Sequence, residues 1–235
     1  MIRYAQNRVL NPNKIGPEYV NPHVLVMGTW QPDYLFDNNM IDSPASKNTW
    51  FKIIKIFEEI AKYASSTNTN LAIITIPSTV QVDSSHFDFY RKTLYNVSRE
   101  LLTTDKPQQL LKEFTSKAEI PYLDLLPYFK KTPNTTALYF ENDDHLSNEG
   151  HLLAYKLVEE QMLQPFIKGQ LPMFNVIGIK KFHKKYTGWA VEFAAQKIRE
   201  NEAWFNAVKL KAVEQNIPLD SMIMMDARYV VENDL

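Results

Sequence analysis

Two short runs of β-prone apolar residues, far apart in the chain, constrain the fold most strongly. Leu71-Ala-Ile-Ile-Thr-Ile76 ends at Pro77, and Ile120-Pro-Tyr-Leu-Asp-Leu125 leads into another apolar stretch. Continuous apolar runs of this length are typical of parallel strands that are covered on both faces. Segments with helical periodicity lie before, between and after the two runs. This order predicts a parallel sheet with helical crossovers.

Helical patterns surround both runs. Asn48 to Tyr63 reads as an amphipathic helix, because apolar side chains recur at helical spacing with lysines and glutamates between them. Phe87 to Leu102 also has a helical pattern. Asp105 is expected to cap a further helix that has Pro107 in its first turn and ends near Lys117. Another helix is predicted over Leu152 to Met162, with one face formed by Leu152, Tyr155, Val158 and Met162.

The pattern divides the chain into four segments. Residues 1–47 are irregular, and their one apolar run, His23-Val-Leu-Val-Met-Gly28, is too short to distinguish a strand from a helix. Residues 48–165 form the predicted α/β domain, and residues 166–187 form an irregular, locally basic linker. Residues 188–235 form a helical tail with three expected helices, which we expect to pack on the α/β part or on a partner.

Composition excludes several classes of protein. The 235 residues carry a formal net charge of −1, so no global field favours nucleic acid or an anionic membrane. Cysteine is absent, which excludes disulfides, thiol catalysis and cysteine-ligated zinc. No apolar run approaches the roughly 18 residues of a membrane span, and no signal peptide is visible at Met1. The cellular location stays open.

The stretch Asp143-Asp-His-Leu-Ser-Asn-Glu-Gly150 carries the chemistry. Residues two apart in an extended loop point the same way, so Asp143 can accept a hydrogen bond from His145 and fix the tautomer of the imidazole. His145 can then act as a base. Ser147 is a candidate N-cap for the helix that follows, and Gly150 permits close approach of its first turn.

Two other interpretations of this stretch stay open. An Asp-Asp-His sequence in a loop is often only a solvated turn. The same residues also have spacing that a metal ion would accept, with Asp143, Asp144, His145 and His151 as candidate ligands. Because no further cluster of ligands supports a metal, we expect neither a metal nor another cofactor.

The segment from Asp143 to His151 resembles the last conserved block of the SGNH (GDSL-type) hydrolases. Two other segments resemble blocks of that superfamily in the same order, namely residues 73–82, with a proline after the apolar run, and residues 120–127. The resemblance covers about residues 45–165. It implies the C-terminal part of a flavodoxin-like, three-layer αβα parallel sheet, followed here by a small helical appendage. It also implies that Asp143 orients the catalytic histidine and that His145 is the base.

The chain departs from the family in its nucleophile. The Gly-Asp-Ser block of the family is absent, and the nearest imitation places Thr29 and Trp30 after Gly28. Only about 45 residues separate Gly28 from the run at Leu71, too few for two crossovers. The chain is therefore expected to begin after the family's first half. Ser78, after Pro77, reads as a turn residue, and capping explains Ser147, so we name no nucleophile.

The expected function is hydrolysis of a small acyl or acetyl ester, as on a carbohydrate, by a chain that is inactive alone. Two alternatives remain. One is a non-catalytic α/β binding module whose helical tail binds a protein partner. The other is one fragment of a split enzyme that needs its N-terminal half. The basic and aromatic stretch Ile179 to Tyr186 is interpreted as a solvated linker and not as a phosphate site. The tail resembles helical tails of some bacterial proteins of unknown role.

Overall fold

The computed structural model describes residues 21–170 and 176–233, with the side chains of residues 176–186 left out. The described chain forms two compact units. The first unit contains residues 21–40, 72–116 and 120–170. The second contains residues 41–71, 117–119 and 176–233.

The first unit holds both strands and a series of short helices. Its elements in chain order are α2 (Pro22–Trp30), α3 (Tyr34–Met40), β1 (Ile73–Thr75), α5 (Thr79–Val82), η1 (Ser84–His86), α6 (Phe87–Lys92), α7 (Glu100–Thr103), α8 (Lys106–Ala118), β2 (Tyr122–Asp124), α9 (Leu126–Lys131), η2 (Thr135–Leu138), α10 (Asn148–Val158), the π-helical turn η3 (Glu159–Leu163) and α11 (Gln164–Ile167). The strands at residues 73–75 and 122–124 lie within the two apolar runs that predict them.

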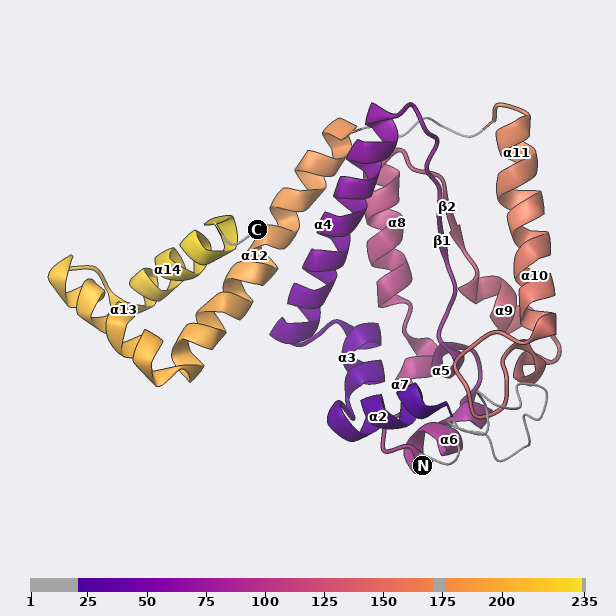
Figure 1. Cartoon of the computed structure of the whole chain (residues 1–235), viewed down its shortest axis with the longest axis horizontal. Helices are drawn as coiled ribbons and strands as arrows, with labels where there is room; N and C mark the ends of the chain where they lie inside the picture. The colour runs from indigo at the N-terminus through magenta and orange to yellow at the C-terminus, as the bar shows by residue number, and fades with distance from the viewer. Residues whose placement is uncertain (1–20, 171–175, 234–235) are drawn as a thin grey trace. The chain divides into compact units, whose positions relative to one another are not determined.

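The two strands form a parallel pair, with Ile74 opposite Leu123 (Figure 1). The amide of Ile73 donates to Pro121 over 2.9 Å, and the carbonyl of Thr75 accepts from Leu125 over 3.1 Å. Because alternate residues of a parallel strand use their backbone groups toward opposite sides, the N–H and C=O of Ile74 point away from β2. Within residues 21–170 and 176–233, no other strand pairs with that edge of β1.

The predicted fold class is wrong. A three-layer αβα parallel sheet needs several long strands, whereas the structure is 72% helical and only 4% strand. The sheet consists of β1 and β2. The protein is therefore mostly helical, and its parallel pair is a small element within a helical first unit.

The sequence leaves the apolar run at residues 23–28 open between a strand and a helix. It forms helix α2. Asn21 caps the helix by accepting from the amide of His23 over 2.9 Å, and Pro22 occupies the first turn, where its missing N–H is not needed. The Asn-Pro pair before the run is thus a helix start.

One of the hydrophobic clusters of the first unit includes Leu123 of β2. It joins Leu123, Leu125, Leu126, Phe129, Leu138, Tyr139, Leu146, Leu157, Met162 and Val82. The expected face of α10 is only half right, because Leu152 and Tyr155 are 54% and 58% exposed while Met162 is buried. The buried Leu157 and Met162 are five residues apart, a spacing that runs into the π-helical turn η3 and departs from the 3.6-residue repeat, so the buried face shifts there.

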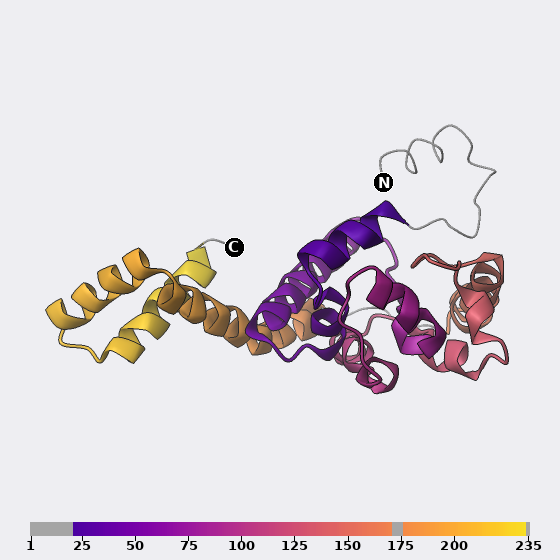
Figure 2. The ribbon, with the colours of Figure 1, turned by 90° about the horizontal axis from the view of Figure 1, so that it is seen from below.

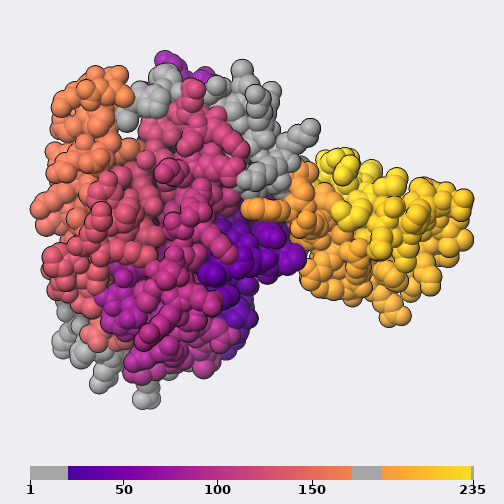
Figure 3. Space-filling model, turned by 180° about the vertical axis from the view of Figure 1, so that it is seen from behind, coloured from indigo at the N-terminus to yellow at the C-terminus, as the bar shows by residue number. Residues whose placement is uncertain are grey.

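The second unit is helical. Helix α4 (Pro44–Ser66) packs against α12 (Val176–Glu200), which packs in turn against α13 (Glu202–Glu214) and α14 (Leu219–Asn233). The orange-to-yellow pair of α13 and α14 can be followed in Figures 1 and 2, and Figure 3 shows the two helices as one continuous mass of atoms. The expected irregular linker at 166–187 is wrong for residues 176–187, which belong to α12.

Apolar residues and a half-buried aspartate hold the last three helices together. Their core joins Val191, Ala194, Ala195, Ile198, Val208, Ala212, Met222, Ile223 and Ala227. Asp226 accepts from the indole N–H of Trp204 over 3.1 Å and from the ammonium of Lys211 over 2.8 Å. The helical tail is therefore a packed group. The side chains of the basic stretch 179–186 lie outside the described residues, so its interpretation stays a prediction.

Candidate functional site

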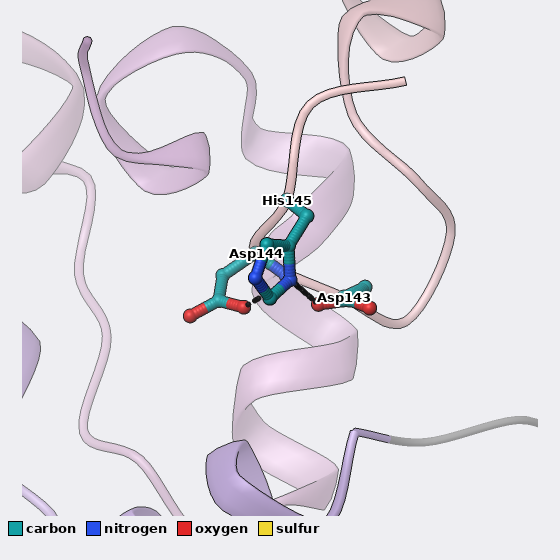
Figure 4. Close-up of side chains that lie close together, drawn as sticks. All are labelled: Asp143, Asp144 and His145. Atoms are coloured by element: carbon teal, nitrogen blue, oxygen red, sulfur yellow. Dashed lines mark hydrogen bonds and ion pairs between the residues drawn. The ribbon is translucent and has the colours of Figure 1, made fainter. Parts of the chain in front are cut away.

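The loop that joins η2 to α10 is a tight hairpin. Tyr139 and Leu146 form an antiparallel bridge, and the amide of Phe140 donates to the carbonyl of His145 over 3.0 Å. Asn142 takes a left-handed backbone conformation, with φ of 58°, at the turn. The hairpin presents Asp143, Asp144 and His145 at its returning arm (Figure 4).

Three contacts fix the base of this hairpin to the start of α10. The amide of Ser147 donates to the carbonyl of Leu138 over 3.0 Å, and its hydroxyl donates to the carbonyl of Ala137. The same hydroxyl oxygen accepts from the amide of Gly150 over 3.2 Å, which confirms Ser147 as the N-cap. A β-carbon on Gly150 would lie 2.1 Å from the Leu138 carbonyl oxygen, so glycine is required there.

The Asp143 carboxylate and the His145 ring are in direct contact. Asp143 Oδ1 lies 2.7 Å from His145 Nδ1 (Figure 4). Asp143 is buried, with a side chain only 6% exposed, whereas the side chain of His145 is 70% exposed. A buried carboxylate thus holds one nitrogen of an imidazole whose ring reaches solvent, which is the arrangement that fixes a tautomer.

The environment of Asp143 favours its charged form. Burial opposes the charge, but hydrogen bonds from His145, from the side chain of Asn21 over 3.1 Å and from the amide of Asp144 over 2.7 Å outweigh it. These bonds lower the pKa of Asp143 to about 2. Asp143 is therefore an anion throughout the physiological range and a permanent acceptor for His145.

Asp144 has a different role. Its carboxylate lies 3.3 Å from His145 Nδ1, and its side chain is 49% exposed. Burial and the neighbouring Asp143 carboxylate raise the pKa of Asp144. Asp144 is thus a weaker partner of the ring than Asp143, and its charge is tolerated because solvent reaches it.

The same three residues also form a group that could hold a metal ion. Ligand atoms of Asp143, Asp144 and His145 lie within 4.8 Å of one another. His151, the fourth predicted ligand, lies exposed on α10 and is not part of this group. An ion bound through Nδ1 would also break the 2.7 Å contact to Asp143. The donor set therefore suits the hydrogen-bonded pair better than a metal.

Neither candidate serine is placed as a nucleophile. Ser78 is the N-cap of α5, where its amide donates to the carboxamide oxygen of Gln81 over 3.2 Å. Gln81 is buried and is itself fixed by the carbonyl of Thr104 over 3.1 Å. The hydroxyl of Ser147 is occupied in capping. Thr29 and Trp30 lie on α2, where Thr29 donates to the carbonyl of Leu25.

Sequence reasoning missed Asn21 and Tyr139. Asn21 lies 122 residues from its partner Asp143, and its Asn-Pro context indicates only a helix cap. Tyr139 donates its hydroxyl to the carbonyl of Pro77 over 2.6 Å and so ties the hairpin to the segment after β1. The sequence shows that Tyr139 lies close to the Asp-Asp-His stretch along the chain. It does not show where the Tyr139 side chain points.

Comparison of the chain with protein-family models, with curated proteins and with solved structures finds no match. Among the helices that the structure describes, none combines the length and apolarity that crossing a membrane requires. The site therefore has to be interpreted from its own geometry.

Proposed function

We propose that Asp143 and His145 are the orienting carboxylate and the general base of a serine-type acyl-ester hydrolase of the SGNH kind. We further propose that the nucleophile lies outside the described residues. The observation that carries the proposal is the 2.7 Å contact between a buried aspartate and a solvent-exposed histidine. A buried anion on Nδ1 keeps the proton there and leaves Nε2 as the basic nitrogen.

The chemistry follows from that assignment. Nε2 of His145 takes the proton of the nucleophilic hydroxyl while its oxygen attacks the ester carbonyl carbon. The tetrahedral intermediate then expels the alcohol, which takes the proton back from Nε2. Water repeats the sequence on the acyl intermediate and releases the acid, so the histidine is regenerated. The substrate we propose is a small acyl or acetyl ester, as on a carbohydrate.

The open edge of β1 supports a nucleophile from elsewhere. The backbone N–H and C=O of Ile74 point away from β2, and the side chains of Ile74 and Ile76 are 40% and 56% exposed. An unpaired edge with exposed apolar side chains accepts an added strand. Because the hairpin is tied to Pro77, two residues after the end of β1, we expect a strand added in parallel to end near the Asp143–His145 pair.

A second candidate function is protein binding through the tail. Leu210 and Val213 on α13 are 65% and 76% exposed, and Tyr229 on α14 is 67% exposed. A contiguous patch of large apolar side chains marks a binding surface, and this second candidate takes these three side chains to form one. This function needs no contribution from His145, which separates it from the first.

The test is serine labelling in the native assembly. The chain is tagged at its own locus, purified without denaturant and treated with a fluorophosphonate, which reacts preferentially with an activated serine; the labelled residue is then identified by mass spectrometry. We expect a labelled serine in the purified material, loss of label in His145→Ala and Asp143→Ala, and retention in Asp144→Asn. The isolated chain should stay unlabelled. Absence of label from the native assembly, or label that survives His145→Ala, would contradict the proposal.

A further inference from the structure

His86 is a buried titratable residue that the proposed mechanism does not use. It ends η1, it is only 7% exposed, and its Nε2 is closed off from solvent without a hydrogen-bond partner among the described residues. Its ring and the ring of Tyr139 meet edge to face, with centroids 6.0 Å apart and planes at 77°. Because Tyr139 donates to the carbonyl of Pro77, His86 lies against the residue that ties the hairpin to the segment after β1.

The surroundings of His86 suit the neutral imidazole and not the imidazolium. The neutral ring carries one N–H, and an Nε2 without a proton presents only a lone pair to its surroundings. Protonation would place a charged N–H at the same closed position, where neither water nor an acceptor of the described residues can receive it. Burial accordingly lowers the pKa of His86, and the attraction of the Asp83 carboxylate only partly offsets this effect.

A pocket beside His86 gives a charged ring a place to move. The pocket has a volume of about 470 Å³, and His86 and Tyr139 line it together with Asp88, Lys92 and Glu141. Asp88 and Glu141 bring two negative charges against the one positive charge of Lys92, so the lining is net negative. An imidazolium that turned into this pocket would gain both solvent and a favourable potential.

The other charges near the ring indicate which carboxylate it would approach. The Asp83 carboxylate already accepts from the amide of Ser85 over 2.8 Å and from the hydroxyl of Thr135. Asp88 is paired with Arg91 over 3.1 Å. Glu141 lies on the hairpin itself and has no such pairing among the described residues, so we expect the imidazolium to turn toward it.

We propose that His86 is an acid-triggered switch of the hairpin. At neutral pH the uncharged ring packs against Tyr139 and supports the hairpin. In acid the charged ring turns into the pocket toward Glu141, and Tyr139 loses that support. This movement needs neither a nucleophile nor a substrate. Its consequence for activity, a site that loosens and fails as pH falls, rests on the proposed function.

The pH range of the switch follows from burial. A released His86 ring has a pKa near the ordinary 6.5 of histidine, whereas the packed ring has a lower pKa. The packed state is therefore fully favoured above pH 6.5, and the released state gains as pH falls below that value. At pH 5 the ratio of released to packed molecules can rise by at most about thirtyfold, which is the ratio of charged to neutral imidazole in the released ring.

Hydrogen exchange of the full chain, followed by NMR between pH 7.5 and pH 5, tests the switch. The amides of Phe140 and Ser147 close the hairpin, and their protection factors correct for the intrinsic dependence of exchange on pH. We expect both protection factors to fall at least fivefold at pH 5, with a midpoint that matches the titration of the His86 ring signals. His86→Phe keeps an aromatic ring beside Tyr139 but cannot be charged, so it should hold both factors constant.

Control variants separate His86 from the titratable groups of the hairpin. Asp144, whose pKa is raised, and His145 both lie in the hairpin and can respond to acid themselves. Asp144→Asn and His145→Gln should nevertheless keep the loss of protection, whereas Glu141→Gln should reduce it by removing the acceptor for the imidazolium. His151→Gln on the exposed surface of α10 should leave the loss unchanged.

The outcomes decide the proposal. Protection that stays constant down to pH 5, or that falls equally in His86→Phe, overturns it. If His86→Phe does not fold, the titration of the wild-type ring decides alone, and a His86 pKa at or above 6.5 overturns the switch. A chain that switches while its native assembly carries no labelled serine retains this inference and loses the proposed function, and a labelled assembly without the pH response does the reverse.

Discussion

The phenolic hydroxyl of Tyr139 donates to the carbonyl oxygen of Pro77 over 2.6 Å, and this contact joins two segments 62 residues apart. Pro77 lies two residues after the end of β1, and Tyr139 begins the hairpin that carries Asp143 and His145. The contact thus positions the site relative to the strand pair. Burial raises the pKa of Tyr139, so its hydroxyl stays a donor.

Tyr139→Phe should weaken this connection. It leaves a buried carbonyl without its donor, so we expect the free energy of unfolding to fall by about 1–2 kcal/mol. Urea denaturation measures the change. Tyr128→Phe is the matched control, because Tyr128 is 37% exposed and its loss of a hydroxyl should change stability by less than about 0.5 kcal/mol. Equal losses in both variants would contradict the role of the contact.

Asp143→Asn should destabilise the protein at neutral pH and much less in acid. The pKa of Asp143 is about 2 in the folded state, against 3.8 for an unperturbed aspartate, so its charge stabilises the fold above pH 4. That contribution, about 2 kcal/mol, is lost as pH falls through 4 toward 2. Denaturation of both proteins at pH 7 and pH 3 measures it.

Asp144→Asn is the matched control for Asp143→Asn. The pKa of Asp144 is raised, so its charge is disfavoured in the folded state, and its removal should leave stability at pH 7 unchanged or slightly higher. Nitrogen NMR of the His145 ring adds a second measurement. The Nδ1–H tautomer should persist in Asp144→Asn and be lost in Asp143→Ala.

Glu58 should make stability fall as pH rises. Its side chain is buried on α4, Oε1 has no hydrogen-bond partner among the described residues, and burial raises its pKa to about 7 despite Lys55 and Lys62. The folded state therefore holds a proton that the unfolded state releases. Between pH 4.5 and 7 this costs up to about 3 kcal/mol. Glu58→Gln should remove that slope, whereas Glu59→Gln should leave it.

Gly150→Ala and Gly188→Ala should change stability in opposite directions. A β-carbon on Gly150 meets the Leu138 carbonyl at 2.1 Å, and the resulting strain should cost about 1–3 kcal/mol. Gly188 lies exposed within α12 with nothing within 4 Å of the added carbon, so alanine should stabilise that helix by about 0.5–1 kcal/mol. Thermal unfolding compares the two, and a stable Gly150→Ala variant would show that the helix start can shift.

The sequence predicts local structure well where the interactions join residues that are close together in the chain. The Ser147 cap, the two strands and helices α4, α8, α13 and α14 follow from patterns within a few residues. The sheet was overestimated because the three-layer architecture followed from the family resemblance, whereas the two apolar runs by themselves predict only the two strands that form. The face of α10 was misplaced because a π turn leaves no mark in a 3.6-residue pattern.

The same distinction holds for the site. Asp143 and His145 are two residues apart, so their contact could be predicted from the sequence. Asn21 also bonds Asp143, and Tyr139 ties the hairpin to Pro77. Both contacts join residues that are far apart in the chain, and no pattern in a single sequence indicates them.

The contacts that close the hairpin determine which insertions in this loop leave the Asp143–His145 contact intact. The carbonyl of Leu138 accepts a hydrogen bond from the amide of Ser147, and the backbone of Gly150 lies so close to that carbonyl that a β-carbon would clash with it. The two arms of the hairpin are therefore held at a fixed separation. An inserted residue near Glu141 only enlarges the tip. A single residue inserted between Asp143 and His145 would instead turn the two side chains to opposite sides of the chain. They lie on the same side now because they are two residues apart in an extended segment. Natural variants of this loop should therefore differ in length before Asp143 and not between Asp143 and His145.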